Sequence, residues 1–129
     1  MAYARIVSTA DNYLHHISNG HFDVDADEPA ALGGQGKGFA PFDLYLASLA
    51  ACTAITLRMY AQRKGWDLDS IEVDARYDVD GDGNRTISRT VTLPASLDAD
   101  KRARLAEIAE KTPVTKAVRE GTPIATEFA

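Results

Sequence analysis

The sequence contains a single cysteine, Cys52, so no disulfide bond can form within the chain. This excludes the small secreted scaffolds that several disulfides hold together, and it favours a reducing compartment. The N-terminus also lacks an apolar run of signal-peptide length. We therefore expect a cytoplasmic protein.

Positive charge is scarce as well. The chain has 14 Lys and Arg residues against 19 Asp and Glu, which gives a net charge of -5 at pH 7. Binding to a nucleic-acid backbone requires a basic excess, so we expect no nucleic-acid partner. The longest apolar stretch, residues 42–57, is interrupted by Asp43 and several hydroxyl side chains. It falls short of the roughly 20 apolar residues of a membrane span, so we expect no membrane partner.

What remains is an ordinary globular composition, with 45% hydrophobic and 26% charged residues over 129 positions. That length suits one domain, residues 1–129, with its own core. The first quarter carries strand signals. Residues 5–7 form a short apolar stretch, and residues 13–18 and 21–25 flank Asn19-Gly20, a strong signal for a two-residue hairpin turn.

A two-residue turn would pair Ile17 with Phe22 and His15 with Val24. Because side chains alternate between the two faces of a strand, one face is then apolar apart from His15. That face carries Tyr13, His15, Ile17, Phe22 and Val24.

Residues 27–40 form a loop that is rich in glycine. The run Gly33–Gly38 lacks the Gly-Lys-Ser/Thr ending of a phosphate-binding loop and matches no dinucleotide fingerprint. We interpret it as a plain loop with tight turns or close backbone approaches, and we expect no cofactor.

A long helix is predicted for residues 41–64, because Pro41 suits a first helical position and Gly65 suits the residue after the last. Its mainly apolar residues form two stripes along the helix. The first comprises Phe42, Tyr45, Leu46, Leu49, Cys52, Thr53 and Thr56, and the second comprises Leu44, Ala47, Ala51, Ile55 and Met59. A helix that is apolar nearly all round must be covered on most sides. In so small a chain a sheet can cover one side and a second subunit the other, which predicts a homodimer.

Two strands with alternating patterns, residues 71–78 and 85–93, flank an acidic segment that opens like a calcium-binding loop. The twelfth position, where calcium loops carry a glutamate, is Arg89. We interpret the segment as a hairpin turn and keep calcium binding as a minor alternative. A helix starts near Asp98, a second one is capped by Thr112 and starts at Pro113, and residues 123–128 are expected to form a closing strand. The fold class is α+β.

Cys52 lies in the middle of the long helix. A lone cysteine is usually a small buried apolar residue, whereas a thiolate nucleophile needs a positive group nearby, for which His15 or a helix terminus is a candidate. A zinc site of histidines and Cys52 is not expected, because the adjacent His15 and His16 point to opposite faces of a strand and no Cys-x-x-Cys pair exists. We expect no metal.

The runs Gly33–Leu44 and Leu46–Ala54 resemble the hallmark of the OsmC/Ohr family, the osmotically inducible and organic hydroperoxide resistance proteins of the bacterial stress response. The segments 56–61 and 63–66 resemble an OsmC-like subgroup, here with a single cysteine. The resemblance implies an OsmC-like α+β fold with N-terminal antiparallel strands, a long central cysteine helix, a second strand pair and C-terminal helices. It also implies an intertwined homodimer with active sites at the subunit interface.

The family's peroxidases use two cysteines, with an arginine and a glutamate that hold the first one as thiolate. Cys52 matches the first cysteine, while Thr112 stands at the position of the second. The glutamate position is occupied by Phe42, with Asp43 as the nearest carboxylate, and no arginine lies between Arg5 and Arg58.

Two functions therefore compete. One is a thiol redox enzyme that reduces an organic hydroperoxide through Cys52 with an external thiol reductant, with His15 and Asp43 as candidate catalytic residues. The other is a non-catalytic dimer that binds a small apolar ligand.

Overall fold

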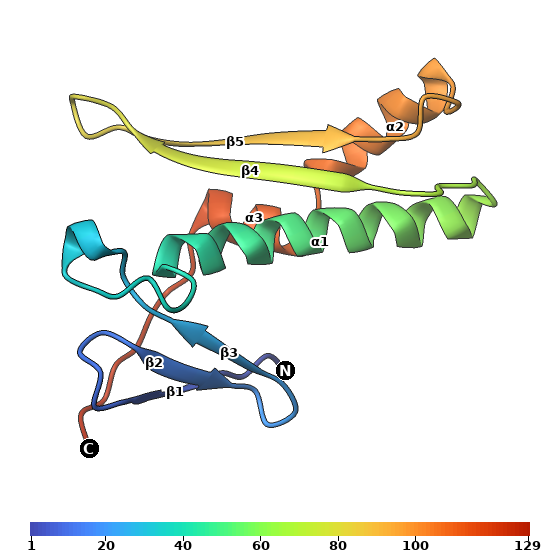
Figure 1. Ribbon diagram of the computed structural model, residues 1–129. Helices are drawn as coiled ribbons and strands as arrows, with labels where there is room; N and C mark the ends of the chain where they lie inside the picture. Colours follow the sequence, from blue (N-terminus) through green and yellow to red (C-terminus); the bar gives the residue numbers. More distant parts are fainter. The chain divides into compact units, whose positions relative to one another are not determined.

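The chain divides into two units, residues 1–45 and residues 46–129, which we call the N-terminal and C-terminal units. The computed structural model describes residues 1–129. The order of elements along the chain is mixed α and β, as predicted. It comprises β1 (Arg5–Ser8), β2 (His15–Ser18), β3 (Asp23–Ala26), the short 3-10 helix η1 (Ala30–Leu32), α1 (Pro41–Lys64), β4 (Glu72–Val79), β5 (Arg85–Thr92), α2 (Ala99–Ala109) and α3 (Pro113–Glu120) (Figure 1).

In the N-terminal unit, β1, β2 and β3 form an antiparallel sheet in that order. Ile17 pairs with Ile6 on one side and with Val24 on the other, while His15 pairs with Ser8 and Ala26. Paired residues share a face in an antiparallel sheet. His15, Ile17 and Val24 therefore share one mainly apolar face, as the alternation predicts.

The predicted register of the β2–β3 hairpin is wrong by two residues. Ile17 pairs with Val24 instead of Phe22, and Ser18 pairs with Asp23, which leaves a four-residue loop. The side chain of Asn19 explains the longer loop, because its Oδ1 accepts hydrogen bonds from the backbone N–H groups of His21 (2.9 Å) and Phe22 (2.8 Å). Phe22 therefore lies in the turn and is 78% exposed.

The glycine-rich segment is a loop that returns to the sheet at Phe39, which bridges Ala26 in parallel orientation. A buried carboxylate organises it: Asp27 accepts hydrogen bonds from the N–H groups of Glu28 (2.8 Å), Gln35 (3.2 Å) and Lys37 (3.1 Å). These bonds, the one from Lys37 foremost, lower the pKa of Asp27.

Gly34 explains why this loop needs glycine. A Cβ atom at that position would lie 1.9 Å from the carbonyl oxygen of Glu28, which is far inside van der Waals contact. The loop can therefore close around Asp27 only if residue 34 has no side chain, which requires glycine.

The ends of α1 are those predicted. At its start, Asp43 accepts a hydrogen bond from the backbone N–H of Ala40 (3.0 Å), which is the reciprocal half of a capping box. At its end, the N–H groups of Gly65 and Trp66 donate to the carbonyls of Gln62 (3.1 Å) and Ala61 (2.8 Å). This is a Schellman motif, and the φ of 71° at Gly65 is the left-handed conformation that it requires.

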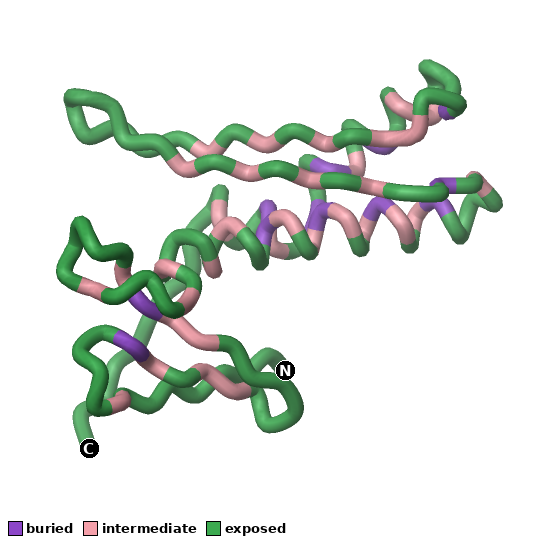
Figure 2. The backbone as a smooth tube through the Cα atoms, in the orientation of Figure 1, coloured by how far each residue is buried: buried purple, intermediate pink, exposed green.

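Only one face of α1 is buried within the chain (Figure 2). This face consists of four residues spaced one turn apart: Leu49, Thr53, Leu57 and Ala61. On another face, Ile55 is 56% and Met59 is 58% exposed. The helix is long and apolar enough to span a membrane by length and composition, a test that core helices of soluble proteins also pass.

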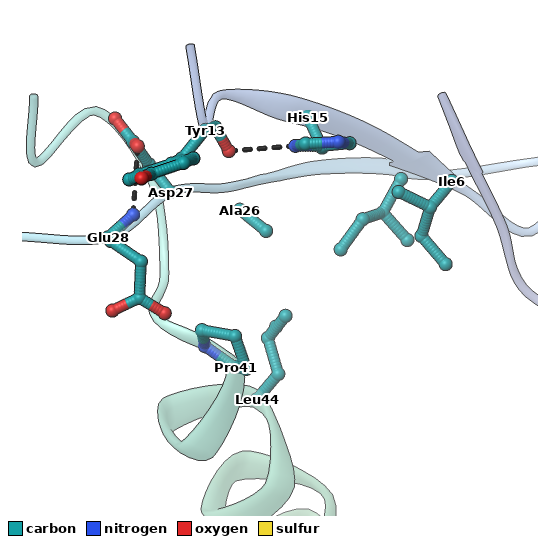
Figure 3. Close-up of a pocket in the computed structure, with 9 residues that line it drawn as sticks. Ile6, Tyr13, His15, Ala26, Asp27, Glu28, Pro41 and Leu44 are labelled. Atoms are coloured by element: carbon teal, nitrogen blue, oxygen red, sulfur yellow. Dashed lines mark hydrogen bonds between the residues drawn. The ribbon is translucent and has the colours of Figure 1, made fainter. Parts of the chain in front are cut away.

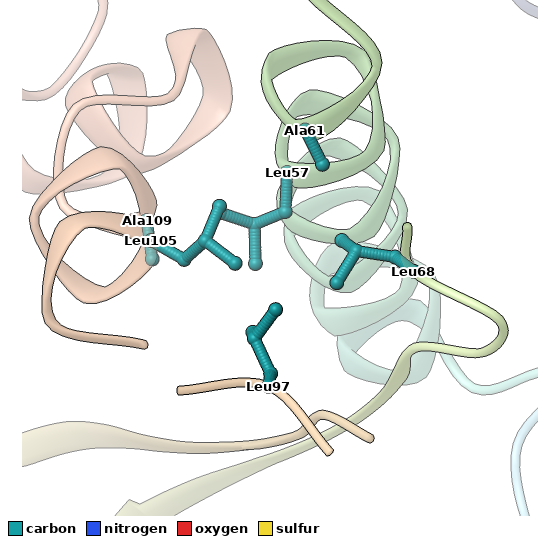
Figure 4. Close-up of a cluster of buried hydrophobic side chains, with 6 residues drawn as sticks. All are labelled: Leu57, Ala61, Leu68, Leu97, Leu105 and Ala109. Carbon is teal, nitrogen blue, oxygen red and sulfur yellow. The ribbon is translucent and has the colours of Figure 1, made fainter. Parts of the chain in front are cut away.

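The C-terminal unit is built around a core of buried apolar side chains from α1, α2 and the segments that follow α1 and β5 (Figure 4). They are Leu57, Ala61, Leu68, Leu97, Leu105 and Ala109. β4 and β5 form an antiparallel hairpin whose half-buried and exposed residues alternate as predicted. Val91 of this hairpin packs against the core.

The acidic segment is a hairpin turn, as interpreted from the sequence. Oδ1 of Asp80 accepts hydrogen bonds from the N–H groups of Asp82 (2.8 Å) and Asn84 (2.9 Å), and Oδ2 accepts one from the Asn84 side chain (3.0 Å). The bonds from Asn84 are the main cause of a lowered pKa at Asp80. The carboxylate is thus engaged in shaping the turn.

The predicted closing strand is wrong for this chain. Residues 122–129 follow α3 without regular secondary structure, and they are exposed. A strand is stabilised by hydrogen bonds to a neighbouring strand, and this segment pairs with none. Its apolar pattern, with Ile124 88% exposed, is left uncovered.

Candidate thiol site

Cys52 is half-buried near the middle of α1. Its Sγ lies 3.9 Å from Oγ1 of Thr56, one turn further along the same helix. This contact is a weak hydrogen bond at the limit for sulfur, so the helix holds the thiol only loosely.

The next residue, Thr53, is fully buried and is fixed far more firmly. Its hydroxyl donates to the carbonyl of Leu49 (2.7 Å) and accepts from Nη1 of Arg89 (2.9 Å). The same Nη1 also donates to Oγ1 of Thr115 (2.9 Å). Arg89 of β5 therefore joins the cysteine helix to α3.

The other terminal nitrogen of Arg89 completes the arrangement. Nη2 donates to the carbonyl of Ala109 (3.2 Å) and approaches Oε1 of Glu110 at 3.4 Å. Glu110 also binds Arg119 through its other carboxylate oxygen. The side chain of Arg89 is only 12% exposed, so its charge is held inside the unit by hydroxyl, carbonyl and carboxylate oxygens.

Thr112 caps α3 as predicted, and it is fully buried. Its Oγ1 accepts from the N–H of Thr115 (3.3 Å) and lies 2.6 Å from the Thr115 hydroxyl. A continuous chain of hydrogen bonds therefore leads from Thr112 through Thr115 and Arg89 to Thr53. It connects the position of the second cysteine with the neighbour of Cys52.

The role of Arg89 was missed from the sequence, where it was noted only as the wrong residue for a calcium loop. A signal was present: Arg89 occupies an inward-facing position of an alternating strand, between Ile87 and Val91. A cation placed among core positions needs buried acceptors, and its partners come from segments far apart in the chain.

The two candidate catalytic residues, His15 and Asp43, lie in the N-terminal unit, and both have structural contacts there. Nδ1 of His15 is 2.8 Å from the carbonyl oxygen of Tyr13, and Asp43 caps α1. Their partnership with Cys52 stays a prediction. His16 is paired across the sheet with Asp25 at 2.6 Å. Residues 1–129 contain no cluster of three or more His, Cys, Asp or Glu side chains suited to a metal ion.

The N-terminal unit also contains a pocket of about 470 Å³. Its lining combines the inner face of the sheet, the start of the glycine-rich loop and the first turn of α1 (Figure 3): Ile6, Tyr13, His15, Ile17, Ala26, Asp27, Glu28, Pro41 and Leu44. Most of this lining is apolar, which suits a small organic molecule.

The chain is similar to a known protein family and to several solved structures. A family model described as OsmC-like protein matches residues 34–127. No curated protein matches the sequence. Among solved structures, the organic hydroperoxide resistance protein OhrB of Bacillus subtilis is 29% identical over 92% of this chain and 90% of its own, with a TM-score of 0.63.

Two further structures share the fold. An OsmC-like protein from Mycoplasma pneumoniae has a TM-score of 0.78 at 17% identity, covering 92% of this chain and 87% of its own. A putative osmotic stress induced and detoxification response protein from Psychrobacter arcticus has a TM-score of 0.77 at 21% identity, covering 91% and 88%. The fold predicted from the sequence resemblance is confirmed.

Proposed function

Because the chain belongs to the OsmC-like protein family, we propose that it is a thiol redox protein in which Cys52 reduces an organic hydroperoxide and an external thiol restores the cysteine. The likeness to a hydroperoxide resistance protein supports this substrate class. The central position of Cys52 on α1 supports its role as nucleophile.

The proposed reaction balances with two equivalents of thiol. The Cys52 thiolate attacks one oxygen of the hydroperoxide, so an S–O bond forms, the O–O bond breaks and the alcohol leaves after taking up a proton. Cys52 is thereby oxidised to a sulfenic acid. An external thiol attacks its sulfur and releases water, and a second external thiol frees Cys52 and leaves as a disulfide.

One observation carries the need for an external thiol. The chain has no second cysteine. Thr112, at the corresponding position, is fully buried and its hydroxyl is hydrogen-bonded to that of Thr115. A sulfenic acid on Cys52 therefore has no thiol within its own chain to condense with. We expect it to persist until a thiol arrives from outside.

We keep His15 and Asp43 as proposed supporting residues. His15 is the one histidine on the inner face of the N-terminal sheet, and Asp43 is the carboxylate next to the family's glutamate position. If His15 supports the thiolate, His15→Asn slows the oxidation of Cys52, whereas His21→Asn, in the hairpin loop, leaves the rate unchanged.

The test is the rate at which Cys52 is oxidised by an organic hydroperoxide, compared with a free thiol at the same pH. We expect Cys52 to react at least about tenfold faster, which corresponds to about 1.4 kcal/mol of transition-state stabilisation. Cys52→Ser is the control for other oxidisable groups. A rate equal to that of the free thiol contradicts the proposal.

We further propose that the protein works as a homodimer formed through the exposed apolar face of α1. Ala47, Ala51, Ile55 and Met59 recur along this face and are exposed in the single chain. Sedimentation should give a dimer at micromolar concentration, and Ile55→Glu should abolish it by burying a charge in the interface. A monomeric wild-type protein contradicts this assembly.

The family fold is soluble, and we propose a cytoplasmic location and a single domain over residues 1–129. The family match supports the domain assignment because it includes parts of both units. Neither the reaction nor the assembly as proposed requires a cofactor. A second candidate function is the binding of a small apolar ligand without chemistry, which the pocket in the N-terminal unit favours.

A further inference from the structure

The pocket of the N-terminal unit combines apolar walls with a few polar side chains, among them His15. The inner face of the sheet, with Ile6 and Ala26, forms one wall, and Pro41 and Leu44 form the opposite wall (Figure 3). His15 stands among these apolar side chains. Its imidazole can therefore form a hydrogen bond with a polar group of a bound molecule.

The state of that imidazole follows from its one contact. Nδ1 of His15 lies 2.8 Å from the carbonyl oxygen of Tyr13, and a carbonyl oxygen can only accept a hydrogen bond. Nδ1 therefore carries the proton. In the neutral ring the lone pair is then on Nε2, so this nitrogen can only accept. The matching ligand group is a hydrogen-bond donor.

The charged residues that line the pocket further restrict the class of ligand that it can bind. Glu28 and Asp27 line the pocket and no lysine or arginine does, so an anionic head group meets repulsion without a counter-ion. Both oxygens of Asp27 are engaged by backbone N–H groups, which leaves them unavailable to a ligand. Glu28 is the one carboxylate left to pair with a cationic head group, which would lose its hydration against a mostly apolar wall. A neutral donor remains.

We propose that this pocket binds small, neutral, largely apolar molecules of the phenol or alcohol type, whose hydroxyl group donates to Nε2 of His15. The proposal rests on the binding function that we put forward second, and it uses no residue of the Cys52 chemistry other than His15, whose part there is a separate proposal. The Tyr13 carbonyl acts on the ligand only by fixing the tautomer of His15.

The test uses the full-length Cys52→Ser protein, so that thiol oxidation cannot contribute. Three probes of similar size differ only in their polar group: 4-methylphenol donates a hydrogen bond, 4-methylanisole cannot donate, and 4-methylbenzoate is an anion. At a pH where the imidazole is neutral, we expect 4-methylphenol to bind about five- to tenfold more tightly than 4-methylanisole, the usual value of one hydrogen bond. Binding of 4-methylbenzoate should be weaker still.

A second readout locates the contact. The ¹⁵N resonance of His15 Nε2 should move when 4-methylphenol is added, and it should stay in place with 4-methylanisole. His15→Phe keeps a ring of similar shape without an acceptor, so this variant should lose the preference for 4-methylphenol. His16→Gln changes the neighbouring residue on the opposite face of β2 and should retain it.

Three results overturn the proposal: equal affinities for 4-methylphenol and 4-methylanisole, an unmoved Nε2 resonance, or no binding of any probe at millimolar concentration. If His15→Phe does not fold, the probe series and the resonance in the Cys52→Ser protein still decide. A negative binding result does not change the expected rate of Cys52 oxidation. A slow oxidation of Cys52 does not change the expected affinities for the probes. The two proposals can therefore fail separately.

Discussion

Each unit of this protein has a charged side chain that is largely withdrawn from solvent, and its hydrogen bonds are arranged differently in the two units. In the N-terminal unit the carboxylate of Asp27 collects three backbone N–H groups from a single loop. In the C-terminal unit the guanidinium of Arg89 donates to groups from α1, α3 and the end of α2. Asp27 therefore orders local structure, whereas Arg89 ties together elements that are distant in sequence.

The difference teaches where each unit is vulnerable. Removal of Asp27 loosens one loop, whose other contacts remain, while removal of Arg89 takes one donor away from acceptors on three elements. An unsatisfied buried polar group costs about 1–3 kcal/mol. We therefore expect the C-terminal unit to depend more strongly on its buried charge.

The largest effect is expected for Arg89→Ala. The variant leaves Thr53, Thr115 and the Ala109 carbonyl without their shared donor, and the free energy of unfolding should fall by about 3 kcal/mol. Urea denaturation measures the change. Arg76→Ala is the matched control, because Arg76 lies on the outward face of the same hairpin and its loss should stay within about 0.5 kcal/mol. Equal effects of the two variants would contradict the account.

Gly34→Ala tests the loop that surrounds Asp27. Its Cβ would meet the Glu28 carbonyl oxygen, so the loop must shift, at a cost of about 2 kcal/mol. Gly81→Ala, in the β4–β5 turn, is the control because a Cβ there meets nothing within 4 Å. Thermal unfolding compares the two, and the close approach is refuted if Gly34→Ala is as stable as the control.

Thr112→Ala is expected to cost about 1 kcal/mol, the usual value of an N-cap, since the α3 N–H groups lose their acceptor. Thr112→Cys tests the geometry around Cys52. If the chain keeps the family arrangement, hydroperoxide treatment of this variant should join the introduced thiol to Cys52 in an intramolecular disulfide, detectable by the mass of its peptides. Absence of that disulfide would show that this arrangement is not kept.

The smallest effect is a pH dependence from Asp27. Its pKa is lowered from 3.8 in the folded chain, so its ionised form stabilises the fold above about pH 4, and this contribution is lost as the pH falls through the folded-state pKa. Denaturant midpoints should therefore decrease more steeply below pH 4 for the wild type than for Asp27→Asn. Parallel pH profiles of the two proteins would show that ionised Asp27 does not stabilise the fold.

The sequence predicted the parts of the fold that local chemistry determines. Pro41 and Gly65 set the ends of α1, and Thr112 sets the start of α3, because each end depends on a residue at a defined helical position. The β2–β3 register failed, since the Asn19 side chain favours a longer loop than the Asn-Gly pattern suggests.

The remaining differences depend on contacts between distant segments. Residues 123–128 have a strand-like pattern, but a strand also requires a neighbour, and that is a tertiary property. Likewise, the position of Arg89 could be read as inward-facing, whereas its partners Thr53 and Thr115 could not be identified before the elements were placed. Cys52 was a candidate nucleophile from the sequence, whereas the hydrogen bonds of its neighbour Thr53 could be identified only in the structure.

The most direct test of the central claim is the stoichiometry of hydroperoxide consumption by the purified protein. Without added thiol, each chain should consume one equivalent of an organic hydroperoxide and stop with Cys52 as sulfenic acid, and dithiothreitol should then restore continuous turnover. Cys52→Ser should consume none. Consumption that is unaffected by Cys52→Ser, or no consumption by the wild type, would contradict a one-cysteine redox function.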